Sequence, residues 1–311
     1  MVDVIAILCS DIHLSLKPPQ AREGEQDWFE AMAHPLALLS IARNFYSAPI
    51  LCAGDIFDKW NSPPELINFA LRNLPRMYAV PGQHDLPLHN YGDRNKSAFW
   101  TLVEAGLVTP LRPNKSEGIT LDAKRINLTV HGFPWGFSIK EPRPNPHRLI
   151  IGIVHQYLWI DNHTYPGAPE KMKATKARKD FEGYDVLVFG DNHKGFLTTR
   201  GNTVIFNCGG LMRRAADEID YQPQIGLLHK SGEVEVVLLD TTQDKIKPVG
   251  PTSDPVDDIK APVDNMELQE FLNELTGLEE TTLDFVEAMK RAIRKKKPSP
   301  EVRKILLEAM E

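Results

Sequence analysis

Five short polar motifs each follow a run of apolar residues, and together they supply oxygen and nitrogen atoms of the kind that bind metal ions. In an extended segment, residues i and i+2 point to the same side. Asp11 and His13 can therefore face one site, as can Asp191 and His193. In chain order the motifs are Asp11-Ile12-His13, Gly54-Asp55-Ile56-Phe57-Asp58, Gly82-Gln83-His84-Asp85, His155-Gln156 and Gly190-Asp191-Asn192-His193.

Each motif alone is a weak signal, and their repetition at successive strand ends is a strong one. Carboxylate, amide and imidazole ligands without a thiolate favour Mn²⁺, iron or Zn²⁺, and the large share of oxygen favours Mn²⁺, with Mg²⁺, iron and Zn²⁺ as alternatives. A carboxylate such as that of Asp55 can bridge two ions. Two ions about 3.5–4 Å apart can clamp a phosphate and activate a hydroxide for in-line attack. The motifs therefore predict a two-metal site that hydrolyses a phosphate ester.

The motifs need a frame of strands whose ends meet at one edge. Near-continuous Val, Ile and Leu runs suit strands that are buried on both faces. We predict strands at residues 3–10, 49–53, 77–80, 126–131, 148–155, 185–189, 203–207, 225–228 and 234–239. We predict helices at residues 27–44, 64–73 and 97–105. This interleaving predicts a layered α/β domain, and the short turns between the late strands indicate that part of the sheet is antiparallel.

The composition changes after residue 240. Residues 245–265 contain four prolines and four aspartates with little apolar periodicity, which is typical of a linker. Short amphipathic helices are expected after it, the last of them starting at the N-cap Ser299 with Pro300 at the first helical position. We predict a catalytic domain at 1–240, a linker at 241–264 and a C-terminal helical docking element at 265–311.

The bulk composition indicates a globular protein of the cytoplasm. No stretch of the 311 residues reaches the 18 or more apolar residues of a membrane span, and the first residues do not look like a signal peptide. The three cysteines fit a reducing compartment better than a disulfide framework. A formal charge of −6 argues weakly against a protein that coats nucleic acid with its whole surface, but it leaves room for a local basic groove.

The ordered motif set resembles the calcineurin-like metallophosphoesterase superfamily, over residues 3–240. The resemblance implies a two-sheet β-sandwich flanked by helices, with two metal ions at the strand ends and a bridging hydroxide that attacks the phosphate. It implies that Asp55 bridges the ions. It implies ligands of the first ion at Asp11, His13 and His193, and ligands of the second at Gln83, His155 and Asp191.

The same resemblance gives roles to residues that are not ligands. The residue that matches His84 contacts the phosphate and serves as an acid, with Asp85 behind it. Asp58 is expected to support the ligands from outside the metal site.

Two positions depart from the usual pattern of this superfamily. Gln83 stands where an Asn is usual, so the amide oxygen reaches one methylene further. Asp191 stands where a His is usual, and an anion there makes the second site harder, which favours Mn²⁺ or Mg²⁺ over Zn²⁺. If Asp191 does not bind metal, the second site is weak.

Within the superfamily the chain looks most like DNA-repair nucleases of the SbcD type, in a compact, phage-like version. That likeness implies DNA as substrate, an SMC-like coiled-coil ATPase bound through the C-terminal helices, and possible homodimers through helices of the N-terminal third. Two alternatives stay open. One is a small-molecule phosphodiesterase or nucleotidase, and the other is a weakly catalytic recruitment subunit.

Basic and aromatic residues outside the motifs are candidates for contact with the substrate. Arg213, Arg214 and His89 are candidate phosphate contacts. Trp135 and Trp159 can stack on a base, although core packing is the commoner role of tryptophan. Lysines and arginines between the fourth and fifth motifs either track a phosphate backbone or form a solvated face.

Overall fold

The computed structural model describes residues 3–22, 27–113, 118–123, 126–145, 148–161, 163, 168–176, 179–242 and 244–247. The predicted helices at 265–311 and most of the predicted linker lie outside the described residues. The chain divides into two units. The first comprises Met1–Pro87 and Tyr91–Pro248, and the second comprises Leu88–Asn90 and Val249–Glu311.

One six-stranded sheet carries the first three motifs. Its strand order is β12-β11-β1-β2-β3-β4, in which β1 to β4 are parallel and β11 and β12 are antiparallel additions. Its strands are β1 (Val4–Cys9), β2 (Ile50–Cys52), β3 (Met77–Ala79), β4 (Val108–Pro110), β11 (Gln224–His229) and β12 (Val234–Leu238). The parallel order brings the carboxyl ends of β1, β2 and β3 to one edge.

The second six-stranded sheet carries the last two motifs. Its order is β5-β6-β7-β8-β10-β9, with β6, β7, β8 and β10 parallel and an antiparallel strand at each edge. Its strands are β5 (Ile119–Ala123), β6 (Ile126–Phe133), β7 (Leu149–His155), β8 (Val186–Gly190), β9 (Phe196–Arg200) and β10 (Thr203–Asn207). The carboxyl ends of β7 and β8 are again neighbours.

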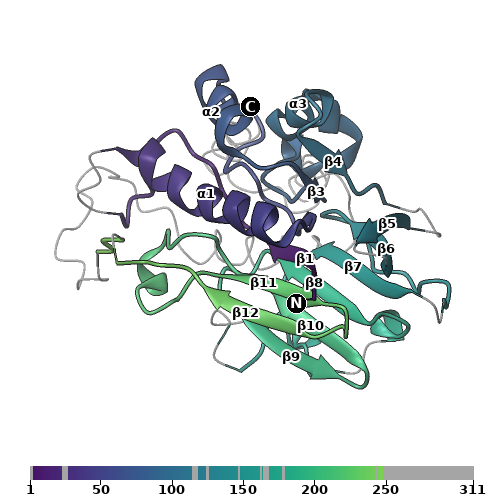
Figure 1. The fold of residues 1–311 in the computed structure, drawn as a ribbon. Coiled ribbons are helices and arrows are strands. Elements are labelled where there is room, and N and C mark those ends of the chain that lie inside the picture. Colours follow the sequence, from purple (N-terminus) through teal and green to yellow (C-terminus); the bar gives the residue numbers. More distant parts are fainter. Residues whose placement is uncertain are drawn as a thin grey trace, which may run out of the picture. The chain divides into compact units, whose positions relative to one another are not determined.

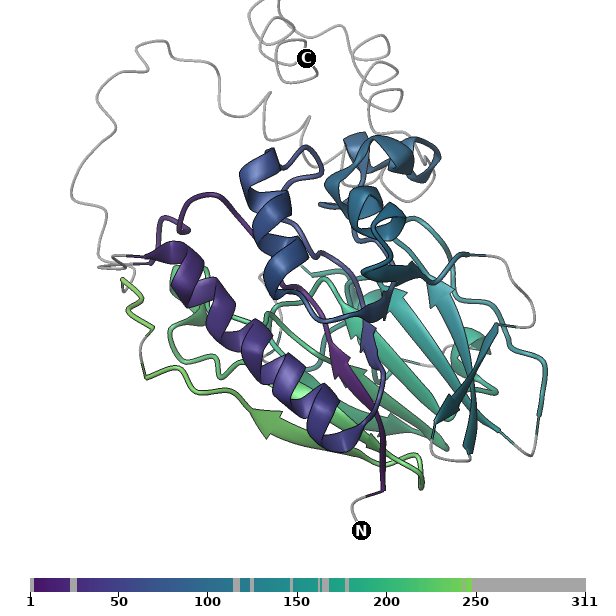
Figure 2. The same cartoon turned by 45° about the horizontal axis from the view of Figure 1, so that its top comes forward.

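Three α-helices cover the first sheet on one face (Figures 1 and 2). They are α1 (Trp28–Tyr46), α2 (Pro64–Asn73) and α3 (Ala98–Glu104). Side-chain oxygens start two of them: Asp27 accepts a bond from the amide of Glu30 at 3.1 Å, and Ser97 accepts one from the amide of Trp100 at 3.2 Å. The remaining helical turns are 3-10 segments at Pro87–His89, Tyr91–Lys96, Glu170–Met172, Lys179–Phe181 and Ala216–Glu218.

Buried apolar side chains form three clusters, which correspond to layers. The largest lies between the helices and the first sheet, the second between the two sheets, and the third on the outer face of the second sheet. A bulge in β1 turns the neighbouring residues Ile5 and Ala6 to the same, inter-sheet side. The expected two-sheet sandwich with flanking helices is thereby confirmed.

The sequence analysis missed three strands, and all three are short edge strands. β4, β5 and β9 lie at the ends of the two strand orders. An edge strand has a partly solvated side, so its sequence lacks the continuous apolar run of a central strand. Phe196–Arg200, for example, alternates buried and more exposed residues.

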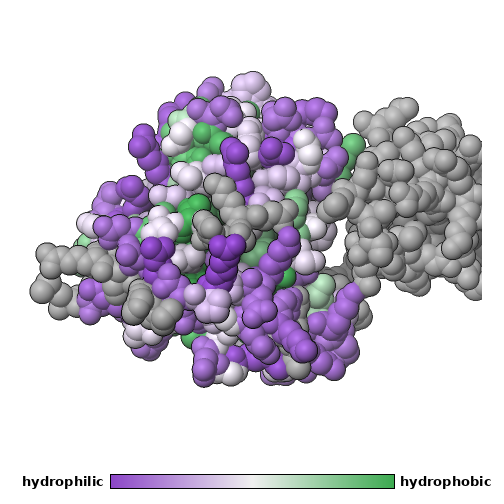
Figure 3. Space-filling view, turned by 90° about the vertical axis from the view of Figure 1, so that its right-hand side faces the viewer, coloured by the Kyte–Doolittle hydropathy of each residue, from purple (hydrophilic) through white to green (hydrophobic). Residues whose placement is uncertain are grey.

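On the side that faces right in Figure 1, the described residues are mostly hydrophilic, with small and separate apolar patches (Figure 3). None of the described helices combines the length and the apolar character needed to cross a membrane.

Candidate metal centre

The ends of five parallel strands position the motif residues. Asp11 follows β1, Asp55 follows β2 and Gln83 follows β3, all from the first sheet. His155 is the last residue of β7, and Asp191 comes directly after β8, both from the second sheet. Asp55 and His155 contact each other, so the two sheets meet at these ends.

The backbone at these strand ends adopts an unusual conformation. Asp11, His13, Asp55 and Asp191 all have positive φ, at 48°, 49°, 53° and 86°. Asp and His tolerate this left-handed region better than most residues, and its cost of order 1–3 kcal/mol per residue is commonly borne at functional sites. Backbone bonds of 2.9 Å from the amide of Asp11 to Gly54 O and from the amide of His13 to Asp55 O hold the first two loops together.

Glycines make room for the buried side chains. A Cβ on Gly82 would collide with Asp55 Oδ1, and one on Gly54, whose φ is +106°, would collide with His155 Nδ1. A Cβ on Gly190 would collide with Ser10 Oγ. The Gly-Asp and Gly-Gln steps of the motifs are therefore required by close approach as well as by turning.

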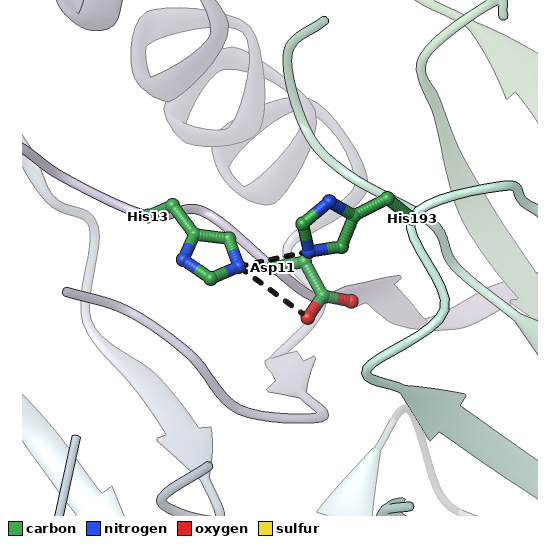
Figure 4. A group of neighbouring side chains, drawn as sticks. All are labelled: Asp11, His13 and His193. Carbon is green, nitrogen blue, oxygen red and sulfur yellow. Dashed lines mark hydrogen bonds and ion pairs between the residues drawn. The ribbon is translucent and has the colours of Figure 1, made fainter. Parts of the chain in front are cut away.

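The first group of potential ligands comprises Asp11, His13 and His193 (Figure 4). The Nε2 atoms of His13 and His193 lie 3.1 Å apart, and Asp11 Oδ1 lies 3.9 Å from His13 Nε2. Asp11 and His13 come from the loop after β1, and His193 comes from the loop after β8. The ligand atoms of all three converge within 4.8 Å of one another.

The second group comprises Asp11, Asp55 and His155. Asp55 Oδ2 lies 3.4 Å from His155 Nε2 and 3.7 Å from His13 Nε2, so it stands between the two groups. This oxygen is buried and has no hydrogen-bond partner among the described residues. A buried carboxylate oxygen without a donor is costly unless a cation occupies the space beside it.

The two unusual residues of the second site bond to each other. Gln83 Nε2 donates to Asp191 Oδ1 at 2.6 Å, and Gln83 Oε1 lies 2.6 Å from His155 Nε2. The longer Gln side chain thus spans from His155 to Asp191. The structure therefore places Gln83 and Asp191 beside His155, and their binding to one ion remains a prediction.

Both ring nitrogens of His155 face oxygen atoms. Nδ1 donates to the carbonyl of Ala53 at 2.5 Å, and Nε2 faces Gln83 and Asp55. Burial alone would lower the pKa of His155, but the charges of Asp55, Asp11 and Asp191 raise it well above its usual range. The surrounding carboxylates therefore favour a positive charge beside this ring.

Burial and neighbouring charges also shift the pKa values of the carboxylates in the site. Burial raises the pKa of Asp11, and burial together with the neighbouring Asp55 raises the pKa of Asp191 to about 6. Burial also works against charge on Asp55, but His155 and His84 hold the pKa of Asp55 below its usual value. An acid-rich site of this kind fits divalent cations, whose charge would balance that of the carboxylates.

His84 lies on the exposed side of the site. Its Nδ1 donates to the carbonyl of Asp58 at 3.0 Å, and its ring packs edge-on against His13 with the centroids 5.0 Å apart. The backbone amide of His84 donates to Asp55 Oδ1 at 3.0 Å, which ties this loop to the bridging carboxylate. The contact of His84 with a phosphate remains a prediction.

Asp85 is placed differently from the expectation that it stands behind His84. Its carboxylate is buried and accepts three backbone bonds of 3.0–3.2 Å, from the amides of Ile56, Phe57 and Gly82. The turn sends these two neighbouring side chains to different sides. Burial and the charge of Asp55 raise the pKa of Asp85 to about 7. Asp85 thus braces the loops that carry Asp55 and Gln83.

Asp58 and Arg214 lie beside His13, and Asp58 forms a third group of potential ligands with His13 and His84. Asp58 Oδ1 lies 3.6 Å from His13 Nδ1 and accepts a bond from Arg214 Nη2 at 2.8 Å. Arg214 Nη1 donates to the carbonyl of His13 at 2.6 Å. The guanidinium that the sequence suggested as a phosphate contact is therefore engaged with the residues that hold His13.

The other candidate substrate contacts lie in different surroundings. Arg213 donates to the carbonyls of Ile219 and Thr241 and pairs with Asp244 at 3.4 Å. His89 belongs to the 3-10 turn Pro87–His89, part of which falls in the second unit. Their contact with phosphate remains a prediction.

The two candidate tryptophans lie in different surroundings. Trp159 is buried, donates to the carbonyl of Pro169 at 3.0 Å and packs under Lys173, so it is a packing residue. Trp135 is half-buried, and its ring lies 6.4 Å from that of His155. Trp135 is therefore the tryptophan that borders the ligands.

The sequence analysis missed Glu218. It is 3% exposed, and its Oε1 lies 3.1 Å from His193 Nδ1. Its other oxygen accepts bonds from the amides of Arg214 and Ala215. Glu218 follows no apolar strand, so the strand-end pattern that revealed the other residues carried no signal for it.

The comparisons agree with this geometry. A model of the calcineurin-like phosphoesterase family matches residues 6–195, a range that contains every motif residue from Asp11 to His193. No protein with a curated description matches the chain.

Several solved structures are similar to parts of this chain. An archaeal phosphodiesterase is 12% identical with a TM-score of 0.36, over 75% of this chain and 99% of that one. A protein assigned as a 5′-nucleotidase from Staphylococcus aureus is 13% identical with a TM-score of 0.43, over 87% and 58%. A 5′-nucleotidase precursor from Thermus thermophilus is 13% identical with a TM-score of 0.43, over 78% and 55%. This chain thus matches little more than half of either nucleotidase, and similarity at this level carries no information on substrate.

Proposed function

The chain belongs to the calcineurin-like phosphoesterase family, and from this we propose that it hydrolyses phosphodiester bonds in DNA with two divalent metal ions. Membership indicates a metal-dependent phosphoester hydrolase. The observation that carries the proposal is the place of Asp55, whose buried Oδ2 stands between His13 and His155 at 3.7 and 3.4 Å. One carboxylate shared by two ligand groups is what a two-ion site needs.

The residues on either side of Asp55 would hold the ions. Asp11, His13 and His193 would hold one, and Gln83, His155 and Asp191 the other. Four of these seven side chains offer oxygen, which supports Mn²⁺ as the preferred metal. When bound, such ions polarise a phosphoryl oxygen and provide a nucleophile at neutral pH.

The chain's own residues orient the substrate and move protons. His84 is exposed, and the bond from its Nδ1 to the carbonyl of Asp58 fixes its ring. With Nδ1–H donated to that carbonyl, Nε2 carries a proton only in the imidazolium form of His84, and in that form it can donate to a phosphate oxygen or protonate the departing oxygen, which is the role of an acid in this reaction. Trp135, beside His155, offers a ring face on which a base can stack.

DNA as the substrate is supported by the motif likeness to nucleases of the SbcD type. The phosphoprotein phosphatase branch carries Asp-Arg-Gly after its second motif, whereas this chain has Asp58-Lys59-Trp60. We further propose that an SMC-like ATPase binds the helices predicted at 265–311, which lie outside the described residues.

A set of substrates tests the proposal. Purified protein with Mn²⁺ is offered linear DNA, bis-p-nitrophenyl phosphate and 2′,3′-cyclic nucleotides. We expect degradation of the DNA and loss of all activity in Asp55→Asn. Cleavage of the small esters without any DNA degradation would show a small-molecule phosphodiesterase instead. Inactivity on every substrate, with only one ion bound, would show a weakly catalytic recruitment subunit.

A second variant tests the role of His84. His84→Ala should keep both metal ions, because the ring is not among the proposed ligands, and should lose turnover. Metal content is measured by elemental analysis and turnover on DNA in the same preparation. Loss of metal from this variant would contradict the assigned role.

A further inference from the structure

A pocket lies at the amino ends of β2 and β3, whereas the metal centre lies beyond the carboxyl ends of the same strands. Its volume is about 620 Å³, within the range of small-molecule sites. It is lined at the amino ends of β2 and β3 by Ile50 and Met77, the first residues of those strands. Asp55 follows the carboxyl end of β2, so the two sites lie at opposite ends of this strand.

Two arginines give this pocket its charge. Arg43 comes from the last turn of α1, and Arg76 comes just before β3. Neither guanidinium has a hydrogen-bond or ion-pair partner among the described residues, and none of the described residues that line the pocket is acidic. In a chain of net charge −6, two arginines without a counter-charge in one pocket form a local anion site.

The helix end beside the arginines does not cancel this charge. The C-terminal end of α1 lies at the side of the sheet where β1 begins (Figure 2). Two of its last four carbonyls, those of Arg43 and Asn44, accept bonds of 3.3 Å from the amides of Ala48 and Ser47, respectively. The partial negative charge of a helix end is about half a unit, against two full positive charges.

The rest of the lining limits the kind of anion. Ile50 and Met77 are buried, at 0% and 3% exposure, so the accessible apolar part of the lining consists of Leu107 and the ring of Tyr78, which are both partly exposed. A guanidinium pairs with phosphate through two parallel bonds, and an aromatic ring packs against a base. We propose that this pocket binds a nucleoside monophosphate, with the phosphate on Arg43 and Arg76 and the base over the apolar part.

Titration calorimetry on the full chain tests the pocket separately from catalysis. EDTA is included to keep metal from the other site, and the probe is deoxyadenosine monophosphate. We expect binding that weakens at least tenfold in Arg76→Gln and further in the double variant with Arg43→Gln. Arg72→Gln is the matched control, because Arg72 is exposed, lies four residues away and does not line the pocket.

Each contrary outcome overturns the proposal in a recognisable way. Equal binding in wild type and the double variant would refute the site, as would an equal loss in Arg72→Gln. Inorganic phosphate binding as tightly as the nucleotide would refute the role of the apolar part. Much tighter binding of a single-stranded oligonucleotide, with the same dependence on both arginines, would show that the two arginines bind a nucleic-acid chain and not a mononucleotide. Arg76 lies outside helices and strands, so Arg76→Gln keeps the test valid if the double variant is unstable.

Because the test measures binding without metal, failure of DNA cleavage in the substrate set leaves this proposal unaffected.

Discussion

Glu218 Oε1 lies 3.1 Å from His193 Nδ1, so a buried carboxylate fixes which nitrogen of this histidine faces the metal centre. With Nδ1–H donated to Glu218, Nε2 is the atom left toward His13 and Asp11. Carboxylates that orient a ligand histidine in this way strengthen metal binding.

Glu218→Gln should therefore weaken binding of one metal ion by about 10- to 100-fold while the fold is kept. The single oxygen of the amide cannot accept bonds both from Nδ1–H and from the backbone amides of Arg214 and Ala215, so the variant loses the fixed orientation of His193 as well as the negative charge beside it. Binding of Mn²⁺ is measured by calorimetry. Asp217→Asn is the control, because that neighbouring carboxylate is 66% exposed and pairs with Lys194 instead. Equal affinities in wild type and Glu218→Gln would contradict the prediction.

The same contact predicts a pH dependence in the metal-free protein. Burial would lower the pKa of His193, but the bond to Glu218 and the charge of Asp11 raise it to about 9, above its usual 6.5. A raised histidine pKa stabilises the fold fully below pH 6.5, and the contribution is lost as pH rises through about 9.

The difference in unfolding free energy between wild type and His193→Gln should therefore shrink between those two pH values. Urea unfolding in EDTA at several pH values measures it. A difference that stays constant over this range would show that His193 gains no proton on folding.

Asp191 should determine metal preference at the second ion. Its anionic oxygen makes the site harder, so Asp191→His should raise the affinity for Zn²⁺ relative to Mn²⁺ by at least about tenfold. The ratio is measured by competition between the two metals, with Asp180→His as a control at an aspartate outside the ligand groups. An unchanged ratio would mean that Asp191 is not a ligand.

Trp135 should act on the substrate and not on the metal. Removal of a stacking ring costs about 1–3 kcal/mol per base, so Trp135→Ala should raise KM for single-stranded DNA by about tenfold or more. Hydrolysis of methyl p-nitrophenyl phosphate, which has no base, should change little. Trp159→Phe controls for loss of an indole at a packing position. A parallel loss on both substrates would instead indicate a disturbed metal centre.

The strand-end logic explains how far the sequence could predict the site. Central strands such as Val186–Gly190 are continuous apolar runs, and the polar residue after each is fixed by covalent continuity to the strand end. The convergence of Asp11, Asp55, His155 and His193 follows from strand order, which the motif resemblance supplied.

The sequence could not predict contacts that depend on how distant loops fold together. Glu218 reaches His193 only because the loop after β10 folds back across the site. Asp85 turns away from His84 because its carboxylate accepts bonds from three backbone amides. Edge strands such as β9 gave no apolar run to detect.

The boundary of the catalytic unit gives the last prediction. The predicted linker begins at residue 241, yet Asp244 pairs with Arg22 at 2.9 Å and with Arg213 at 3.4 Å, and the amide of Lys247 donates to the carbonyl of Ala21. The Arg22 side chain is only 2% exposed. The first residues past 240 therefore belong to the packed unit, which extends to Pro248.

Asp244→Ala should consequently destabilise the protein by up to about 3 kcal/mol, because it removes the carboxylate that faces a buried guanidinium. The loss is measured by urea unfolding. Asp240→Ala is the control, since Asp240 is exposed and its carboxylate bonds only to Thr242, two residues further on, among the described residues. Equal stability of the two variants would place the boundary back at residue 240 and reduce the Arg22 pair to a surface contact.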